Sequence, residues 1–272
     1  MELMKISSTI KAIIQDTLNT FGWEIIRLND KVPRDLFDSL VEAYEFEISK
    51  KRPFITRKSH RHYLLGNLIG TSPSEAFYIV ESIARTNSLG GDVCEFGVAQ
   101  GKTSALIANE LIGGSRVLHL FDSFNGLPAP SDEDELKNDI FNLGDINKYE
   151  GKMNFSTKDV IKSLSDLRTP YTQFVIHAGF IADALRESNH LPQNVTFAYI
   201  DFDFYEGITD ALTFVDQVSG IGTEIIVDDY DFFSSGAKLA VDLFINNPKK
   251  HVWGCEVANK SEGHFARLIR IK

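Results

Sequence analysis

Apolar residues in the first fifty positions of the chain recur at helical spacing. The pattern over 8–20 predicts an amphipathic helix, and a second helical pattern covers 35–49. The basic stretch 50–62 follows, and its Pro53 breaks helix continuity. The cations of this stretch either lie on a solvated surface, the usual place for a charge run, or hold an anionic group in a mobile segment. We therefore expect residues 1–70 to form a helical N-terminal extension or lid.

Beyond residue 70 the pattern alternates between helix and strand. A helix over 74–86 is predicted after the capping serines Ser72 and Ser74. Continuous apolar, β-rich runs come after it, and each is followed by a helix-compatible stretch, which is typical of parallel strands buried on both faces. The runs cover 93–98, 117–122, 174–178, 195–202 and 223–228.

The last two β-rich runs differ from the others because no helix separates them. They cover 252–259 and 264–271, and only the four residues KSEG lie between them, which predicts an antiparallel hairpin. The predicted fold is therefore α/β, with one Rossmann-like domain over 71–272. Its sheet has seven strands, is mostly parallel and ends in an antiparallel hairpin.

Composition narrows the classes of partner. The 272 residues carry 28 Lys and Arg against 38 Asp and Glu, a net charge of −10, and this argues against a nucleic-acid surface. The sequence has no run of about 18 apolar residues, so we expect no membrane partner and a cytoplasmic protein. Cys94 and Cys255 sit in apolar runs, where we expect small, buried, reduced side chains.

Ligands of open α/β sheets bind beyond the carboxyl ends of the strands, so the residues at those ends carry the chemistry. The first predicted strand ends in a turn that contains Gly97 and Gly101, and a helix follows. Glycines permit close backbone approach, and a helix N-terminus attracts an anionic or polar group. The spacing is G-x-x-x-G and not the G-x-G-x-x-G of dinucleotide sites, which disfavours an NAD-dependent oxidoreductase.

The second and third strand ends indicate an adenosyl ligand. Asp122 lies 27 residues after Glu95, and a carboxylate at this place accepts hydrogen bonds from ribose hydroxyls. The residues after it, 123–128, have the composition of a turn. Phe180 follows the third strand and is a candidate to pack on a flat ring, whereas His177 within that strand is expected to be structural.

Carboxylates gather at the ends of the fourth and fifth strands. Asp201 and Asp203 leave one strand, and Asp228 and Asp229 end the next. Neighbouring parallel strands lie about 4.8 Å apart, so these carboxylates are expected to converge and to need a counterion. Oxygen-only ligands favour Mg²⁺. The alternative is that Asp203 and Asp229 cap the next helices or face solvent.

Five motifs together resemble one known family. In order along the chain they are EFGVAQG, DSFNGLP, GFIADAL, IDFDFYEGITDAL and IVDDY, within roughly residues 70 to 270. The sequence resembles the macrocin O-methyltransferase-like group of class I S-adenosylmethionine (SAM) enzymes, which methylate sugar hydroxyls of macrolides and related natural products. The seven-stranded sheet of class I methyltransferases also ends in an antiparallel hairpin.

The resemblance implies a set of site residues. Asp201, Asp228 and Asp229 fall where the family binds Mg²⁺, and Asp201 is also the candidate to receive the acceptor proton. Residues assigned to SAM are Glu95, Gly97, Gly101, Thr103, Asp122, Ser123, Gly179 and Phe180. One residue departs from the family pattern, because Phe202 stands where the family usually has glycine between two aspartates. The segment 128–159 does not match strongly, so no acceptor contact is assigned there.

We therefore expect a SAM- and Mg²⁺-dependent O-methyltransferase that acts on a hydroxyl of a sugar or glycosylated natural product by in-line transfer. A metal-dependent methyltransferase of catechols or other phenols is the alternative within enzymology. A non-catalytic SAM-binding scaffold is the alternative from another class. The amphipathic helix over 8–20 is a candidate contact for a homo-oligomer, or it packs on its own domain.

Overall fold

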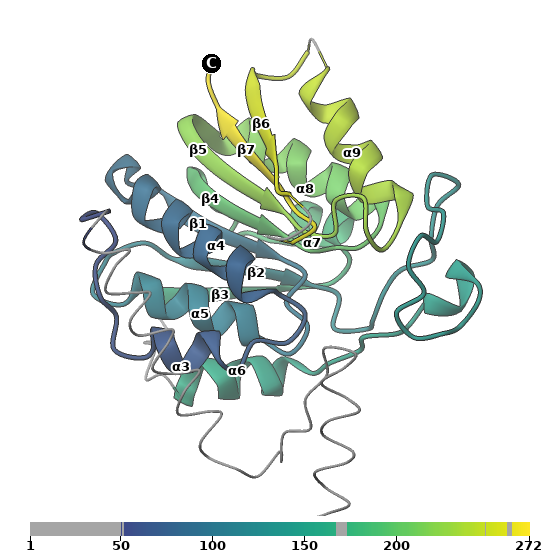
Figure 1. Cartoon of the computed structure of the whole chain (residues 1–272), viewed down its shortest axis with the longest axis horizontal. Helices are drawn as coiled ribbons and strands as arrows, with labels where there is room; N and C mark the ends of the chain where they lie inside the picture. The colour runs from purple at the N-terminus through teal and green to yellow at the C-terminus, as the bar shows by residue number, and fades with distance from the viewer. Residues whose placement is uncertain (1–49, 51, 167–172, 248, 260–262) are drawn as a thin grey trace, which may run out of the picture. The chain divides into compact units, whose positions relative to one another are not determined.

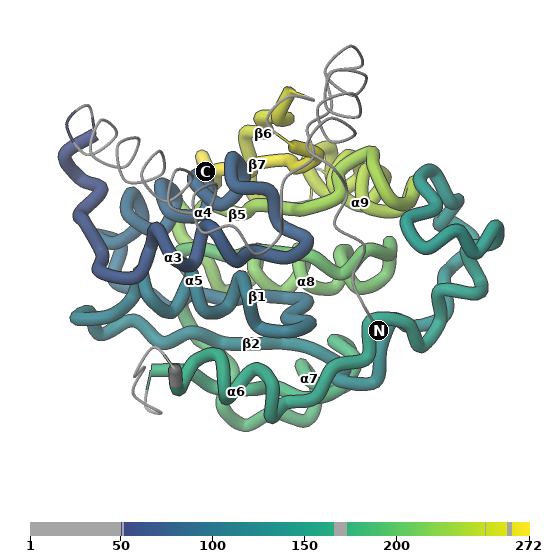
Figure 2. The backbone as a smooth tube through the Cα atoms, turned by 60° about the horizontal axis from the view of Figure 1, so that its bottom comes forward, coloured from purple at the N-terminus to yellow at the C-terminus, as the bar shows by residue number. Residues whose placement is uncertain are grey.

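The computed structural model describes residues 50, 52–166, 173–247, 249–259 and 263–272. The expected helices over 8–20 and 35–49, and any oligomer contact through them, lie outside these residues. The described part is built around one sheet whose strands follow the order β3-β2-β1-β4-β5-β7-β6. Figure 2 shows the same order, from β2 near the bottom of the view to β6 near the top.

The first five strands of the sheet pair in parallel, and β7 runs in the opposite direction to both of its neighbours. β7 pairs antiparallel with both β5 and β6, which confirms the terminal hairpin. The chain reverses its direction across the sheet between β1 and β4, which lie side by side, and this is the place where open α/β sheets bind ligands. The strands are β1 (Asp92–Phe96), β2 (Leu118–Asp122), β3 (Phe174–Ala178), β4 (Val195–Ile200), β5 (Ser219–Val227), β6 (Trp253–Val257) and β7 (Ala266–Arg270).

Helices cover both faces of the sheet (Figure 1). One apolar cluster joins α4, α5 and α6 to one face, and a second joins α7, α8 and α9 to the other. β1 and β4 are buried along almost their whole length, as their continuous apolar sequences predict. The helices are α3 (Arg61–Leu65), α4 (Pro73–Arg85), η1 (Thr86–Leu89), α5 (Lys102–Leu111), η2 (Ile146–Tyr149), α6 (Thr157–Asp166), α7 (Ile181–Glu187), α8 (Tyr205–Val218) and α9 (Ser235–Ile245).

The segment after β2 forms a small cluster of its own. Leu127, Tyr149, Phe204 and Phe233 are buried together, so the segment packs on the residues that follow β4 and β5. In Figure 1 this teal segment extends beyond the strand ends on the right. The cluster therefore holds residues 127–153 beside the carboxyl ends of the central strands.

The basic stretch before α4 is attached to the domain by specific bonds. Arg61 is 1% exposed, and its Nε donates to Glu110 of α5 at 2.9 Å. Lys58 Nζ donates to the carbonyl oxygen of Ile112 at 2.7 Å, and Arg52 pairs with Glu81. The expectation of a solvated or mobile charge run is wrong for Arg61, because its cationic group is buried against a carboxylate. The boundary at residue 70 and the lid role remain predictions.

Cysteine burial follows the expectation at one of two positions. Cys94 in β1 is buried, whereas Cys255 lies on the edge strand β6 and is exposed, and both are free thiols. The prediction of burial at Cys255 is wrong because an edge strand leaves part of its side chains uncovered. Of the helices that the structure describes, none has the length and apolar character that crossing a bilayer requires.

Candidate active site

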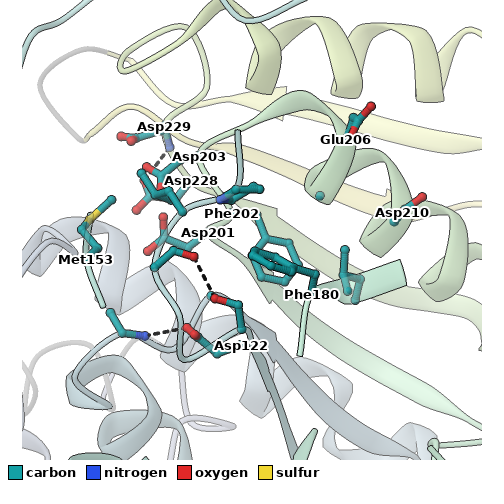
Figure 3. A pocket seen from close by; sticks show the side chains of 18 of the residues that line it. Asp122, Met153, Phe180, Asp201, Phe202, Asp203, Glu206, Asp210, Asp228 and Asp229 are labelled. Carbon is teal, nitrogen blue, oxygen red and sulfur yellow. Dashed lines mark hydrogen bonds between the residues drawn. The ribbon is translucent and has the colours of Figure 1, made fainter. Parts of the chain in front are cut away.

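A cavity of about 480 Å³ opens at the carboxyl ends of the central strands. Its walls come from the turns after β1 to β5, from the starts of α7 and α8, and from the segment after β2 (Figure 3). Seven acidic residues line it, and no Lys, Arg or His among the described residues does so. These seven are Asp122, Asp201, Asp203, Glu206, Asp210, Asp228 and Asp229.

The turn after β1 depends on Gly97. Its φ is +87°, and a Cβ added there would overlap the carbonyl oxygen of Asp201. The amide of Asp201 donates to the carbonyl of Phe96 at 2.7 Å, so the tips of β1 and β4 are held tightly together. Only glycine fits such an approach, which leaves the backbone of this turn bare toward the cavity.

Asp122 at the end of β2 fastens two turns to each other. Its Oδ2 accepts from the amides of Val98 at 2.8 Å and Ala99 at 3.0 Å, and its Oδ1 accepts from the amide of Phe124 at 2.7 Å. Oδ2 already accepts two bonds, whereas Oδ1 accepts one and keeps a second lone pair, so the side chain can still accept a hydrogen bond from a ligand. After it, Ser123 Oγ donates to the carbonyl of Gly126 at 2.8 Å and closes the expected turn.

The residues assigned to the cofactor fall into two groups. Gly97, Asp122, Ser123 and Phe180 line the cavity. The others belong to the same strand ends and turns without lining it: Glu95, Gly101, Thr103 and Gly179.

Glu95 and the first residues of α5 lie next to the glycine turn after β1, behind the cavity wall. Glu95 is 1% exposed and its Oε2 has no hydrogen-bond partner, and burial raises its pKa to about 8. Gly101 has a φ of +72° and is the N-cap of α5, and Thr103 Oγ1 lies 2.7 Å from Thr71 Oγ1. An unpartnered buried carboxylate beside the turn is suited to a cationic group of a ligand.

The four aspartates at the tips of β4 and β5 all line the cavity, as expected from adjacent strands. Asp203 and Asp229 have φ values of +64° and +53°. Left-handed backbone is uncommon outside glycine, and it is concentrated at functional sites. The alternative that Asp203 and Asp229 cap helices is wrong, because the N-caps of α8 and α9 are Phe204 and Ser234.

Burial and mutual repulsion shift the titration of this group. Burial, and then the charge of Asp228, raises the pKa of Asp201 well above its usual range, that of Asp203 to about 7 and that of Asp229 to about 9. No basic side chain of the described residues lies in the cavity to neutralise them. Such a group is stabilised by protons or by a bound cation.

Asp228 is oriented by residues that sequence analysis did not identify. Tyr199 Oη donates to its Oδ2 at 2.9 Å, and the amide of Asp229 donates to its Oδ1 at 2.7 Å. Glu75 of α4 is 2% exposed and shares a side-chain hydrogen bond with Asp228, and burial raises the pKa of Glu75 well above its usual range. The sequence Ser72-Pro-Ser-Glu75 is a capping-box pattern and marks the start of α4. It does not indicate that the same carboxyl group reaches the end of β5.

The chemistry of the aspartates fits a hard divalent cation, since they offer half-buried carboxylate oxygens in a cavity whose described lining contains no Lys, Arg or His. The positions of the side chains do not by themselves form a metal site. Within the residues that the structure describes, no three or more His, Cys, Asp or Glu side chains are already arranged to hold a metal ion. Metal binding at Asp201, Asp228 and Asp229 therefore requires side-chain rotation.

Several cavity residues carry no sequence signal for a site. Ile140 and Met153 come from the segment 128–159, which gave no acceptor contact by sequence, and Phe202 and Phe232 follow the aspartates. Large apolar residues are ordinary core components in a sequence, so only the packed structure shows that these four face a cavity.

Comparisons with known proteins agree with this geometry. The sequence profile of the macrocin-O-methyltransferase (TylF) family matches residues 68–251. The solved structure of the O-methyltransferase NovP is similar, with a TM-score of 0.62 and 17% identity over 86% of this chain and 100% of that one. The calicheamicin methyltransferase CalS11 has a TM-score of 0.57 and 16% identity over 78% of this chain and 90% of that one. No curated protein matches significantly by sequence.

Proposed function

Because the chain belongs to the macrocin-O-methyltransferase (TylF) family and is a SAM-dependent O-methyltransferase, we propose that it methylates a sugar hydroxyl of a natural product with the help of Mg²⁺. The observation that carries the proposal is the set of half-buried aspartates that line the cavity at the tips of β4 and β5, beside the glycine turn of β1. The proposed acceptor is a small molecule, and neither nucleic acid nor a membrane is a proposed partner.

The cofactor site is proposed at the turns after β1, β2 and β3. Bound SAM supplies an electrophilic methyl group on a sulfonium. Asp122 would accept from the ribose hydroxyls, and Glu95 would face the cationic part of the cofactor. Phe180 lines the cavity and would pack against the base, while Gly97 keeps the turn open to the ligand.

The acceptor site is proposed at the aspartates. Asp201, Asp228 and Asp229 would hold a divalent cation, which when bound lowers the pKa of a hydroxyl group beside it. Asp201 would also receive the hydroxyl proton, because its carboxylate lines the cavity at the tip of β4 beside the proposed acceptor. Tyr199 and Glu75 keep Asp228 in place.

Methyl transfer requires that cofactor and acceptor are aligned with each other. The acceptor oxygen must approach along the line of the S–CH₃ bond, so the protein has to hold cofactor and acceptor at fixed relative positions. The short bonds between the tips of β1 and β4 fix the distance between the glycine turn and Asp201. We infer that the closely joined tips of these two strands align the two substrates.

The test of the metal proposal is the Asp228→Ala variant assayed with and without chelator. We expect wild-type turnover to be lost in EDTA and restored by Mg²⁺, and we expect the variant to lose turnover by at least about 100-fold. The variant should bind S-adenosylhomocysteine (SAH) with unchanged affinity, because Asp228 lies away from the turn after β2. Wild-type turnover that persists undiminished in chelator would reject the metal role.

A catechol-type acceptor is the second candidate. The cavity lining also contains apolar residues that suit a flat aromatic ring: Leu127, Pro128, Ile140, Met153 and Phe232. A panel of glycosylated metabolites, nucleotide sugars and catechols, assayed under the same conditions, separates the two. Turnover of catechols alone would replace the sugar proposal.

A further inference from the structure

Phe202 stands between two aspartates of the candidate site and lines the same cavity. The side chain of Phe202 lies against Phe96 of β1 and against Gly207 of α8. Figure 3 shows Phe202 between the aspartates on one side and Glu206 and Asp210 of α8 on the other. The ring therefore forms a wall inside the cavity.

Packing holds this ring in one place. Its centroid lies 6.0 Å from that of Phe96 in an edge-to-face arrangement, which anchors it to the core beneath the sheet tips. On its other side lies Gly207, where an added Cβ would stand 3.2 Å from atoms of the ring. A contact of that length requires the ring to move, so the missing side chain at Gly207 provides the space that Phe202 occupies.

The Phe202 ring separates the space at the aspartates from the space toward α8, and these two spaces suit different parts of the cofactor and the acceptor. The methyl group of SAM must face the aspartates if the acceptor binds there, and the ribose lies between the methyl-bearing sulfur and the base. With the ribose at Asp122, the base then points away from the aspartates, toward Phe180 and Phe202. Apolar ring edges and faces are favourable neighbours for a flat heteroaromatic ring.

We propose that Phe202, seated against Gly207, is a specificity-determining residue that sets the width of the space for the adenine ring of the cofactor. This inference rests on the cofactor placement of the proposed function. The residue pair is a feature of this chain, because the resembled pattern has glycine at position 202. In this chain the large side chain of Phe202 packs directly against the small residue Gly207.

The test is a double-mutant cycle on SAH affinity, measured by calorimetry without metal or acceptor. We expect Phe202→Ala to weaken binding about tenfold, the effect of removing an aromatic neighbour of a base. Gly207→Ala should weaken binding several-fold by pushing the ring into the cavity. In the Phe202→Ala background, Gly207→Ala should change affinity by less than about twofold, because no ring remains to be displaced.

Two further variants keep the test decisive. Phe202→Leu retains an apolar contact with Phe96, so it covers the case in which Phe202→Ala does not fold, and it should weaken SAH binding by an intermediate factor. Phe232→Ala removes a ring from the acceptor side of the cavity, so it should raise the acceptor KM and leave SAH affinity unchanged.

The proposal is overturned if folded Phe202 variants bind SAH like wild type, or if the two substitutions act additively. It is also overturned if Phe202→Leu changes only the acceptor KM. Failure of the metal proposal is a separate result, because chelator-insensitive turnover has no bearing on SAH binding measured without metal.

Discussion

Carboxylates without counterions are the central feature at the scale of single residues. Asp201, Asp203, Asp228 and Asp229 are held close together by the ends of two strands. Burial raises the pKa of each, and the charge of Asp228 further raises the pKa values of Asp201, Asp203 and Asp229. Repulsion between these carboxylates does not stabilise the fold. A cavity that keeps such a group is readily explained by a cationic ligand that neutralises it.

The first prediction concerns the pH dependence of stability without metal. The pKa of Asp229 is about 9 in the folded protein, against 3.8 for the free side chain. A carboxyl group with a raised pKa holds its proton more tightly when folded, so its contribution to stability is lost as pH rises toward 9. We expect the melting temperature in EDTA to fall between pH 6 and pH 9.

Mg²⁺ should restore more of the melting temperature at pH 9 than at pH 6, because at the lower pH it competes with bound protons. Asp229→Asn is the control variant, and it should show a smaller fall with pH, measured by differential scanning fluorimetry. An equally steep fall in this variant would show that Asp229 does not carry the effect.

Among single residues, sequence reasoning placed the carboxylates better than the apolar wall. Asp122 and the aspartates of β4 and β5 were identified because strand ends converge and polar residues there are unusual. Phe202 was noticed only as a departure from a family pattern, and Glu75 was not identified at all. Both reach the site through side-chain packing across elements, which periodicity does not encode.

At the scale of elements, the turn after β1 controls the distance between the cofactor loop and the tip of β4. Gly97 allows the turn to lie directly against the carbonyl of Asp201. Gly113 provides a matched comparison, since its φ of +86° nearly equals the +87° of Gly97 while an added Cβ there meets nothing within 4 Å.

We predict that Gly113→Ala costs about 1 kcal/mol of unfolding free energy, the strain of left-handed backbone alone. Gly97→Ala should cost about 3 kcal/mol or more, because the turn must also separate from β4. It should abolish turnover, whereas Gly113→Ala should retain it. Urea unfolding and activity assays check both; equal costs for the two variants would contradict the role given to the Gly97 contact.

Element types were predictable, and element boundaries were less so. All seven strands are confirmed, and β3 at Phe174–Ala178 has exactly the expected range. β5 begins at Ser219, four residues before the expected 223, because Ser219 pairs with Val195 of β4 ahead of a register shift. Strand pairing, a property of two segments, extends a strand beyond its apolar run.

At the scale of the whole molecule, a buried histidine pair links two strands on the side of the sheet away from the hairpin. His119 Nδ1 of β2 lies 3.0 Å from His177 Nε2 of β3, and His177 Nδ1 lies 2.9 Å from Ser188 Oγ. Burial, and then the proximity of His119, lowers the pKa of His177 to about 4. The expectation of a structural histidine is confirmed by this burial and bonding.

The lowered pKa predicts a loss of global stability in acid. The free histidine value is 6.5, so the contribution of His177 is complete above pH 6.5 and is lost as pH falls toward 4. The difference corresponds to at most about 3 kcal/mol. Urea unfolding of wild type and His177→Gln at pH 7 and pH 4.5 tests this, and we expect the variant to lose less stability in acid. An identical loss in both proteins would assign acid sensitivity to other groups.

The whole fold was predictable from the alternation of helix and strand together with the terminal hairpin. The cavity was only partly predictable. The strand ends that form its floor could be located from the sequence, whereas the apolar residues that the segment 128–159 adds to its wall could not. That segment has little regular structure, and its position depends on the cluster of Leu127, Tyr149, Phe204 and Phe233. Such long-range packing leaves no periodic signal in the sequence.

The central claim is that Asp201, Asp228 and Asp229 bind a divalent cation beside the cofactor. The most direct measurement is a crystal structure of the SAH complex grown with Mn²⁺ in place of Mg²⁺, with anomalous diffraction used to locate the metal. The account predicts one strong anomalous peak within coordination distance of all three carboxylates, at about 2.2 Å. Ordered carboxylates with no peak between them, or a peak bound elsewhere, would contradict it.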